Sequence, residues 1–140
     1  MGADPQPGQL TGGRLLAGIT DEIVATAHAR YGKGPLKAKT YVLDNLITVV
    51  MSNGFIPVEQ AAMDADEPGR VLGMRRDFQE HIEGTYTEIV ERLTGRKVTA
   101  FLSQTHLTPD VTVEMFLLDG PAPGFGSLEV ATALVPHEAA

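Results

Sequence analysis

The spacing of apolar residues predicts a helix near the start of the chain. From about residue 10, Leu15, Ile19 and Ile23 recur at every fourth position, with polar residues on the opposite side. The pattern stops at Tyr31-Gly32-Lys33-Gly34-Pro35, where two glycines and a proline end a helix.

Two further helices are predicted in the middle of the chain. Pro57 suits the first position of a short helix that runs through Met63. After a polar hinge at 64–69, Pro68 opens a long helix for which Gly95 is the expected C-cap. One apolar stripe follows this long helix and contains Val71, Met74 or Arg75, Phe78, Ile82, Tyr86, Ile89 and Leu93.

Four stretches have the composition or alternation of strands, at 36–43, 46–52, 97–107 and 111–118. Asp44-Asn45 joins the first two as a hairpin, and Thr108-Pro109-Asp110 joins the last two. The predicted order is therefore α-ββ-αα-ββ. We predict an α+β fold, with a four-stranded antiparallel sheet and helices packed on one face. The other face would stay open, and some of Tyr41, Thr48, Val50 and Phe116 must point there.

Composition agrees with one folded domain and excludes several classes of protein. The chain has 140 residues, 43% of them hydrophobic and 21% charged, which is typical of a globular protein. No apolar run is long enough to cross a membrane and no signal peptide is visible, so we expect a cytoplasmic protein without membrane insertion. The absence of cysteine excludes disulfides and thiolate sites. A net charge of −7 argues against nucleic-acid binding.

The chain divides into three parts. Residues 1–9 have the composition of a flexible N-terminus, and 10–119 form the domain. Residues 120–140 begin with a Gly/Pro-rich linker. Within this tail, residues 128–135 would dock as an edge strand or short helix, or would stay unstructured.

A basic segment is the first candidate binding site. Arg30, Lys33, Lys37 and Lys39 lie close together, and no acidic residue occurs between Glu22 and Asp44. Lys37 and Lys39 share a strand face, and Gly34 could let backbone N–H groups approach an anion. The segment could bind phosphate, a nucleotide, bicarbonate or an acidic protein. The simpler alternative is a solvated strand face beside a helix C-terminus that favours cations.

Arg75 is the second candidate, because it falls near the apolar stripe of the long helix. It could be a rim residue whose stem packs on the core while its charge reaches water. It could instead pair with an acid across a dimer interface or bind an anion.

Catalytic and metal-binding patterns are missing from the sequence. The four histidines have no metal-ligand spacing. Ser103 and His106 would point to opposite faces of a strand, and no Gly-x-Ser-x-Gly turn is present. We therefore expect no catalytic residues, no metal and no cofactor.

Three stretches together resemble the MpsC-like family of proteins of unknown function. They are 31–35 leading into a hairpin, 53–59, and the end of the long helix at Leu-Thr-Gly-Arg-Lys-Val, 93–98. The resemblance covers about residues 10–119. Two positions depart from the family pattern: Ile56 replaces a helix-capping Thr, and Gln104 replaces an Asp that is common in the third strand. If that Asp has a role in the family, this protein lacks it.

The resemblance implies association with bacterial ion or bicarbonate transport linked to the membrane potential, and it implies no catalytic residues. We expect a non-enzymatic accessory or regulatory protein that acts as a homodimer, beside a membrane transporter subunit or an acidic partner. The alternative is a small-molecule anion-binding domain that uses residues 30–39. An enzyme of unrecognised type is the third hypothesis.

Overall fold

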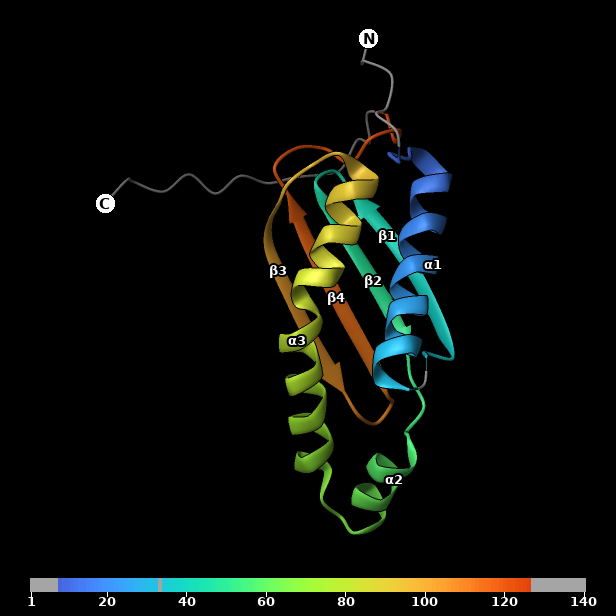
Figure 1. Cartoon of the computed structure of the whole chain (residues 1–140), viewed down its shortest axis with the longest axis vertical. Coiled ribbons are helices and arrows are strands. Elements are labelled where there is room, and N and C mark those ends of the chain that lie inside the picture. Colours follow the sequence, from blue (N-terminus) through green and yellow to red (C-terminus); the bar gives the residue numbers. More distant parts are fainter. Residues whose placement is uncertain (1–7, 33, 127–140) are drawn as a thin grey trace, which may run out of the picture.

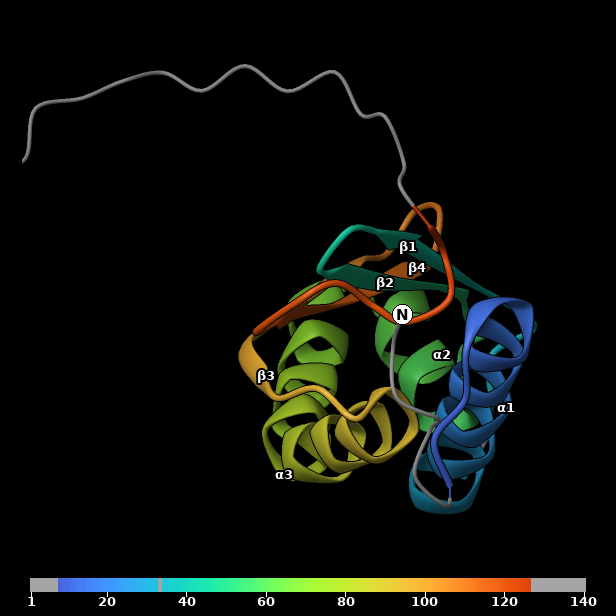
Figure 2. The same cartoon turned by 90° about the horizontal axis from the view of Figure 1, so that it is seen from above.

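The computed structural model describes residues 8–32 and 34–126. The elements follow the predicted order, and they are α1 (Gly12–Tyr31), β1 (Lys37–Leu43), β2 (Leu46–Ser52), α2 (Pro57–Asp64), α3 (Pro68–Thr94), β3 (Val98–His106) and β4 (Val111–Leu118). The strands form one antiparallel sheet in the order β1-β2-β4-β3. Helices α1 and α3 cover one face of it, and α2 lies beyond one end (Figures 1 and 2). The predicted α+β class and its layers are confirmed.

Glycine ends both long helices, as the sequence predicts. Gly32 follows α1 with φ 88°, and Gly95 follows α3 with φ 69°. Both values lie in the left-handed region, which a residue without Cβ enters at little cost. The N–H of Gly34 donates to Nδ1 of His28 at 3.1 Å, so a side chain of α1 also helps to close the turn into β1.

The core lies between the two long helices and the inner face of the sheet. Leu15, Ile19 and Ile23 of α1 are fully buried against it. From the sheet, Ile47 and Val49 of β2 face inward. The alternation of buried and exposed positions along β2 and β4 is the period of two that a sheet with one covered face requires.

The outer face of the sheet has no helix over it. Tyr41, Thr48 and Val50 lie on this face, as predicted, since their strand neighbours point inward. Phe116 does not: it is fully buried and packs against Phe101, with ring centroids 5.1 Å apart. The alternation along β4 explains the difference, because Phe116 is in phase with the buried Leu118.

Residues 120–126 differ from a free linker. Ala122 is buried, and its N–H donates to the carbonyl of Asp44 at 2.9 Å. Phe125 packs against the core, and the N–H of Gly12 donates to the carbonyl of Pro123. This segment therefore closes the end of the sheet near the start of α1. The expectation for 128–135 lies outside the described residues, as do those for most of 1–9.

Alanine substitutions test whether the backbone conformation at Gly32 requires glycine. Gly32 and the exposed, mid-helix Gly84 both have open space where a Cβ would lie. Gly32→Ala should destabilise the fold by about 1–2 kcal/mol, because alanine is strained at positive φ. Gly84→Ala should stabilise it by up to about 1 kcal/mol, because alanine favours the helix. Urea unfolding of both variants measures this, and equal signs would contradict it.

Candidate functional site

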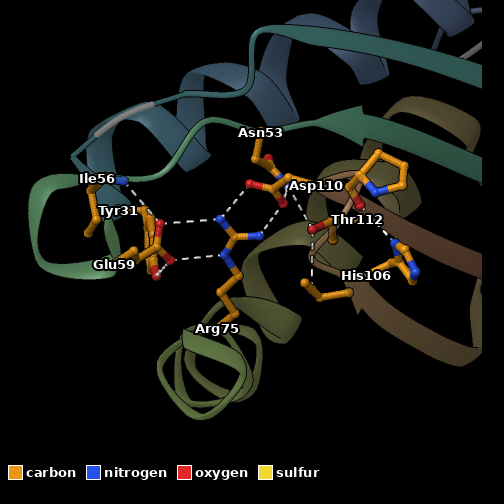
Figure 3. A network of polar contacts seen from close by, with 10 residues as sticks. Tyr31, Asn53, Ile56, Glu59, Arg75, His106, Asp110 and Thr112 are labelled. Carbon is orange, nitrogen blue, oxygen red and sulfur yellow. Dashed lines mark hydrogen bonds and ion pairs between the residues drawn. The ribbon is translucent and has the colours of Figure 1, made fainter. Parts of the chain in front are cut away.

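A buried arginine holds the centre of the main polar cluster. Arg75 occupies the core-facing position of the α3 stripe for which the sequence left Met74 as an alternative, and it is only 9% exposed. Its guanidinium lies between Glu59 of α2 and Asp110, which ends the β3–β4 turn (Figure 3). Arg75 is therefore neither a solvent-reaching rim residue nor free for an added anion. Its anions come from its own chain.

Both carboxylates receive two hydrogen bonds from Arg75. Nε donates to Oε2 of Glu59 at 2.9 Å and Nη2 donates to Oε1 at 3.2 Å. On the other side, Nη2 donates to Oδ2 of Asp110 at 2.9 Å, and Nη1 donates to Oδ1. The planar guanidinium suits this paired geometry, which lysine could not reproduce. The guanidinium also lies 5.4 Å from the ring centre of Phe55.

Glu59 ties α1 and α2 to this cluster. The hydroxyl of Tyr31, the last residue of α1, donates to Oε2 of Glu59 at 2.5 Å. The backbone N–H of Ile56 donates to Oε1 of Glu59 at 3.1 Å, which satisfies one donor at the start of α2. The hydrocarbon side chain of Ile56 cannot return a hydrogen bond to the helix, so only half of a capping box forms.

Asp110 extends the cluster toward the sheet. The N–H of Asn53 donates to the carbonyl of Asp110 at 3.2 Å, which joins the end of β2 to the β3–β4 turn. The amide Nδ2 of Asn53 donates to Oγ1 of Thr112 at 2.8 Å. Thr112 in turn shares a hydrogen bond of 3.2 Å with Thr105 across β3 and β4.

The charges of this network stabilise one another. Burial alone would raise the pKa of Glu59, but hydrogen bonds from Arg75, Tyr31 and the Ile56 backbone hold it below its usual value. Burial would lower the pKa of Arg75, but Asp110 and Glu59 raise it. The pKa of Tyr31 is raised by burial and by its bond to Glu59. All three groups therefore keep their protonation state across the neutral range.

A second buried carboxyl lies farther along β4. Glu114 is 4% exposed, and its Oε2 has no hydrogen-bond partner among the described residues. Burial raises the pKa of Glu114 to about 7, although a hydrogen bond from Ser103 opposes the rise. The pKa of Tyr86 on α3 is raised by burial and by the charge of Glu114, so the phenol is its neighbour.

One cavity connects Glu114 to the arginine cluster. It has a volume of about 60 Å³ and is lined by residues of α1, α3 and the inner face of the sheet, Arg75, Tyr86, Thr112 and Glu114 among them. A cavity needs about 10–15 Å³ to hold one water molecule, so this one has room for a few. Four ionisable groups with shifted pKa values line this cavity: Tyr31, Arg75, Tyr86 and Glu114.

The basic segment does not gather at this cavity. Lys37 and Lys39 are exposed on the outer face of β1, as their shared alternation predicts. Arg30 is exposed in the last turn of α1, in the helix layer on the other side of the sheet. The N–H of Gly34 already donates to His28, and Lys33 lies outside the described residues. Anion binding by these residues stays a prediction.

Among the described residues, Ser103 and His106 point to opposite faces of β3, as the strand alternation predicts. Ser103 faces the cavity, whereas His106 is exposed and contacts the carbonyl of Pro109 at 2.8 Å. His81 contacts the backbone of its own helix at Asp77. Across residues 8–32 and 34–126, no three His, Cys, Asp or Glu side chains group so that they could hold a metal ion.

The structure contains the features on which the family resemblance rests. They are the order of elements, the glycine-closed turn after α1 and the start of α2. The family model described as "Na+-translocating membrane potential-generating system (MpsC)" matches residues 11–120. The chain belongs to the MpsC family. Neither the curated proteins nor the solved structures gave a match.

The two departures from the family pattern have definite places in this MpsC protein. Ile56 is the N-cap of α2, where its backbone N–H donates to Glu59 but its side chain makes no capping hydrogen bond. Gln104 is exposed on the outer face of β3, paired with Val113. In the part of the chain that the structure describes, no helix is long and apolar enough to span a membrane.

Sequence reasoning did not single out Glu59, Asp110 or Glu114. One signal existed for the first two: an arginine at a core position needs buried acids nearby. For Glu114, the apolar residues Val113 and Met115 drew attention to the opposite phase of β4. The structure shows that the phase with Glu114 is the one that faces inward.

The arginine cluster can be tested by truncation. Arg75→Ala should reduce the free energy of unfolding by about 3–5 kcal/mol, because two buried carboxylates lose their counter-charge. Arg76→Ala, at the exposed position next in the chain, should change it by less than about 0.5 kcal/mol. Urea unfolding at pH 7 measures both. Similar small losses in the two variants would show that the cluster contributes little.

The pH dependence of stability reports on Glu114. Its folded pKa of about 7 exceeds the ordinary value of 4.5, so the folded state holds this proton more tightly than the unfolded state. Stability from this group is therefore complete below about pH 4.5 and is lost as the pH rises to about 7, by at most about 3 kcal/mol. Glu59 has the opposite effect, because its pKa is lowered in the folded state. Its contribution to stability is present at neutral pH and is lost on acidification.

Glu114→Gln should remove this dependence, because the amide imitates the protonated acid at every pH. The variant should be more stable than the unmodified protein at pH 8 and similar to it at pH 5. Urea unfolding from pH 5 to 8, with choline chloride as the salt, measures the difference. Parallel curves for the two proteins would contradict it.

Proposed function

We propose that this MpsC protein is a non-enzymatic accessory or regulatory component of a Na+-translocating system, and that it acts as a homodimer on the cytoplasmic side. The family description supports the link to the system. The observation that carries the homodimer is the uncovered outer face of the sheet. The remaining support is the size of the cavity, about 60 Å³, which leaves little room for an organic substrate.

The outer face carries apolar side chains at its centre, although no helix covers it. Its central positions include Val50, Val113 and Met115, and Tyr41 and Leu102 are 54% and 52% exposed. Four strands about 4.8 Å apart and seven residues long make a plate of roughly 400 Å² before side-chain relief is counted. The apolar side chains occupy part of this plate, and an exposed apolar patch on a soluble protein is often an interaction surface.

The strand register aligns the side chains of this face in rows across the sheet, and the character of the rows changes from one end of the strands to the other. The row at one end pairs Leu43 with Leu46 and Leu46 with Leu117. The row at the opposite end begins with Lys37, and the next begins with Lys39. On strands β1 to β4, the described outward positions carry no acidic side chain. The face therefore has an apolar end and a cationic end.

A second copy fits such a face. The twofold axis would run between the two sheets, parallel to them and perpendicular to the strands. It would place the outer faces against each other and reverse the strand direction of one copy relative to the other. The lysine end of each copy then lies over the leucine end of the other, which separates the like charges. The aliphatic stems of Lys37 and Lys39 cover the leucines while their ammonium groups reach water at the rim. The sandwich buries both apolar ends.

The homodimer is tested by oligomeric state. Light scattering after size exclusion should give twice the chain mass at micromolar concentration. Leu102 lies on the edge strand β3, in the middle row of the proposed interface, beside Met115. Leu102→Glu places a charge in that row and should give a folded monomer, with the helical circular dichroism and the urea midpoint retained.

Val58→Glu is the matched control, because Val58 is 57% exposed but lies on α2, away from the outer face. It should stay dimeric. A monomeric parent protein, or a Leu102→Glu variant that stays dimeric, would overturn the homodimer.

A further inference from the structure

The cavity beneath β3 and β4 has a wall of oxygen-bearing side chains. The strand register pairs Ser103 with Glu114 and Thr105 with Thr112. All four residues line the cavity, so they form a square block on the inner face of the sheet. Elsewhere that face is apolar except for Thr40 of β1, which shares a hydrogen bond with Thr20 of α1. Oxygen groups at four adjoining inward positions therefore require a reason other than packing.

Lone pairs in this block stay available to a ligand. Thr105 and Thr112 share one hydrogen bond, and Asn53 donates to Thr112. Whichever threonine donates to the other, Oγ1 of Thr105 keeps a lone pair. Ser103 donates to Glu114, which leaves the lone pairs of its own oxygen unused. Oε2 of Glu114 is buried and has no partner among the described residues.

The charge balance of the cavity is incomplete when Glu114 ionises. The charged or titratable groups that face it are Arg75 and Tyr86 of α3 and Tyr31 of α1. Arg75 is already bonded to two carboxylates, and the two phenols remain neutral. An ionised Glu114 thus lacks a counter-charge within the described structure. A buried carboxylate in that position takes up a proton or a cation.

We propose that this cavity binds a small alkali cation, held by Glu114, Ser103 and Thr105 with water completing its shell. Carboxylate and hydroxyl oxygens are hard ligands, which favour alkali and alkaline-earth ions over softer metals. A single carboxylate balances one positive charge, so a monovalent ion suits the site better than Ca²⁺ or Mg²⁺. The volume of about 60 Å³ accommodates an ion with a few waters and excludes larger organic cations.

The cation and the proton compete for one carboxylate. Occupancy therefore rises with pH, and each bound cation displaces the proton of Glu114. The site does not depend on the outer face of the sheet, so it can be tested separately from the homodimer.

Proton affinity gives the direct test, with Na+ as the probe. The carboxyl carbon of Glu114 is followed by NMR from pH 5 to 9 in NaCl, KCl or choline chloride at equal ionic strength. Na+ or K+ at ten times its dissociation constant should weaken the proton affinity of Glu114 about tenfold relative to choline. An unchanged titration in all three salts would overturn the site.

Thermal unfolding gives a second readout. At pH 8, NaCl or KCl should raise the melting temperature above that in choline chloride, and at pH 5 the salts should be equivalent. Glu114→Gln should abolish the difference, and Ser103→Ala should reduce it. Glu83→Gln, at an exposed position of α3, should retain it. Equal melting temperatures at pH 8, or a difference that Glu114→Gln retains, would overturn the proposal, and neither result depends on whether the protein dimerises.

Discussion

The end of this fold where α2 lies depends on one side chain, the guanidinium of Arg75. Arg75 is the common partner of Glu59 and Asp110, and through them it reaches α1, α2 and the loops after β2 and β3. Helix α2 depends on it most, because this helix is eight residues long and Ala62 is its one buried apolar residue. A buried ion pair adds little net stability compared with apolar packing, but breaking one is costly. The arginine thus selects one arrangement of these segments.

Much of the fold could be predicted because local patterns determined it. The helix-ending glycines at 32 and 95, the hairpin turn at Asp44-Asn45 and the strand at 46–52 each depend on residues adjacent in sequence. Two hairpins and an amphipathic helix then leave few ways to cover one sheet face. The packed segment at 120–126 was missed, because its composition is that of a linker and only long-range contacts hold it.

The candidate site could not be predicted in the same way. Glu59 and Asp110 are separated from Arg75 by 16 and 35 residues, and no local pattern joins them. Glu114 looked like the polar half of an alternating strand, since its neighbours Val113 and Met115 are apolar. Both phases of β4 contain apolar residues, so alternation alone does not decide which side faces the helices. The pairing register with β2 decides it, because Glu114 and Phe116 lie opposite Val49 and Ile47, which face the helices.

The central position of β4 has a consequence for how this sequence can change. Successive residues of the strand belong to different surfaces: Thr112, Glu114 and Phe116 face the cavity and core, and Val113, Met115 and Leu117 face outward. Inserting or deleting one residue would exchange the two sets, placing a carboxylate on the outer face and larger apolar groups in the cavity. A change in the length of this strand therefore disturbs both surfaces together, whereas a substitution affects one.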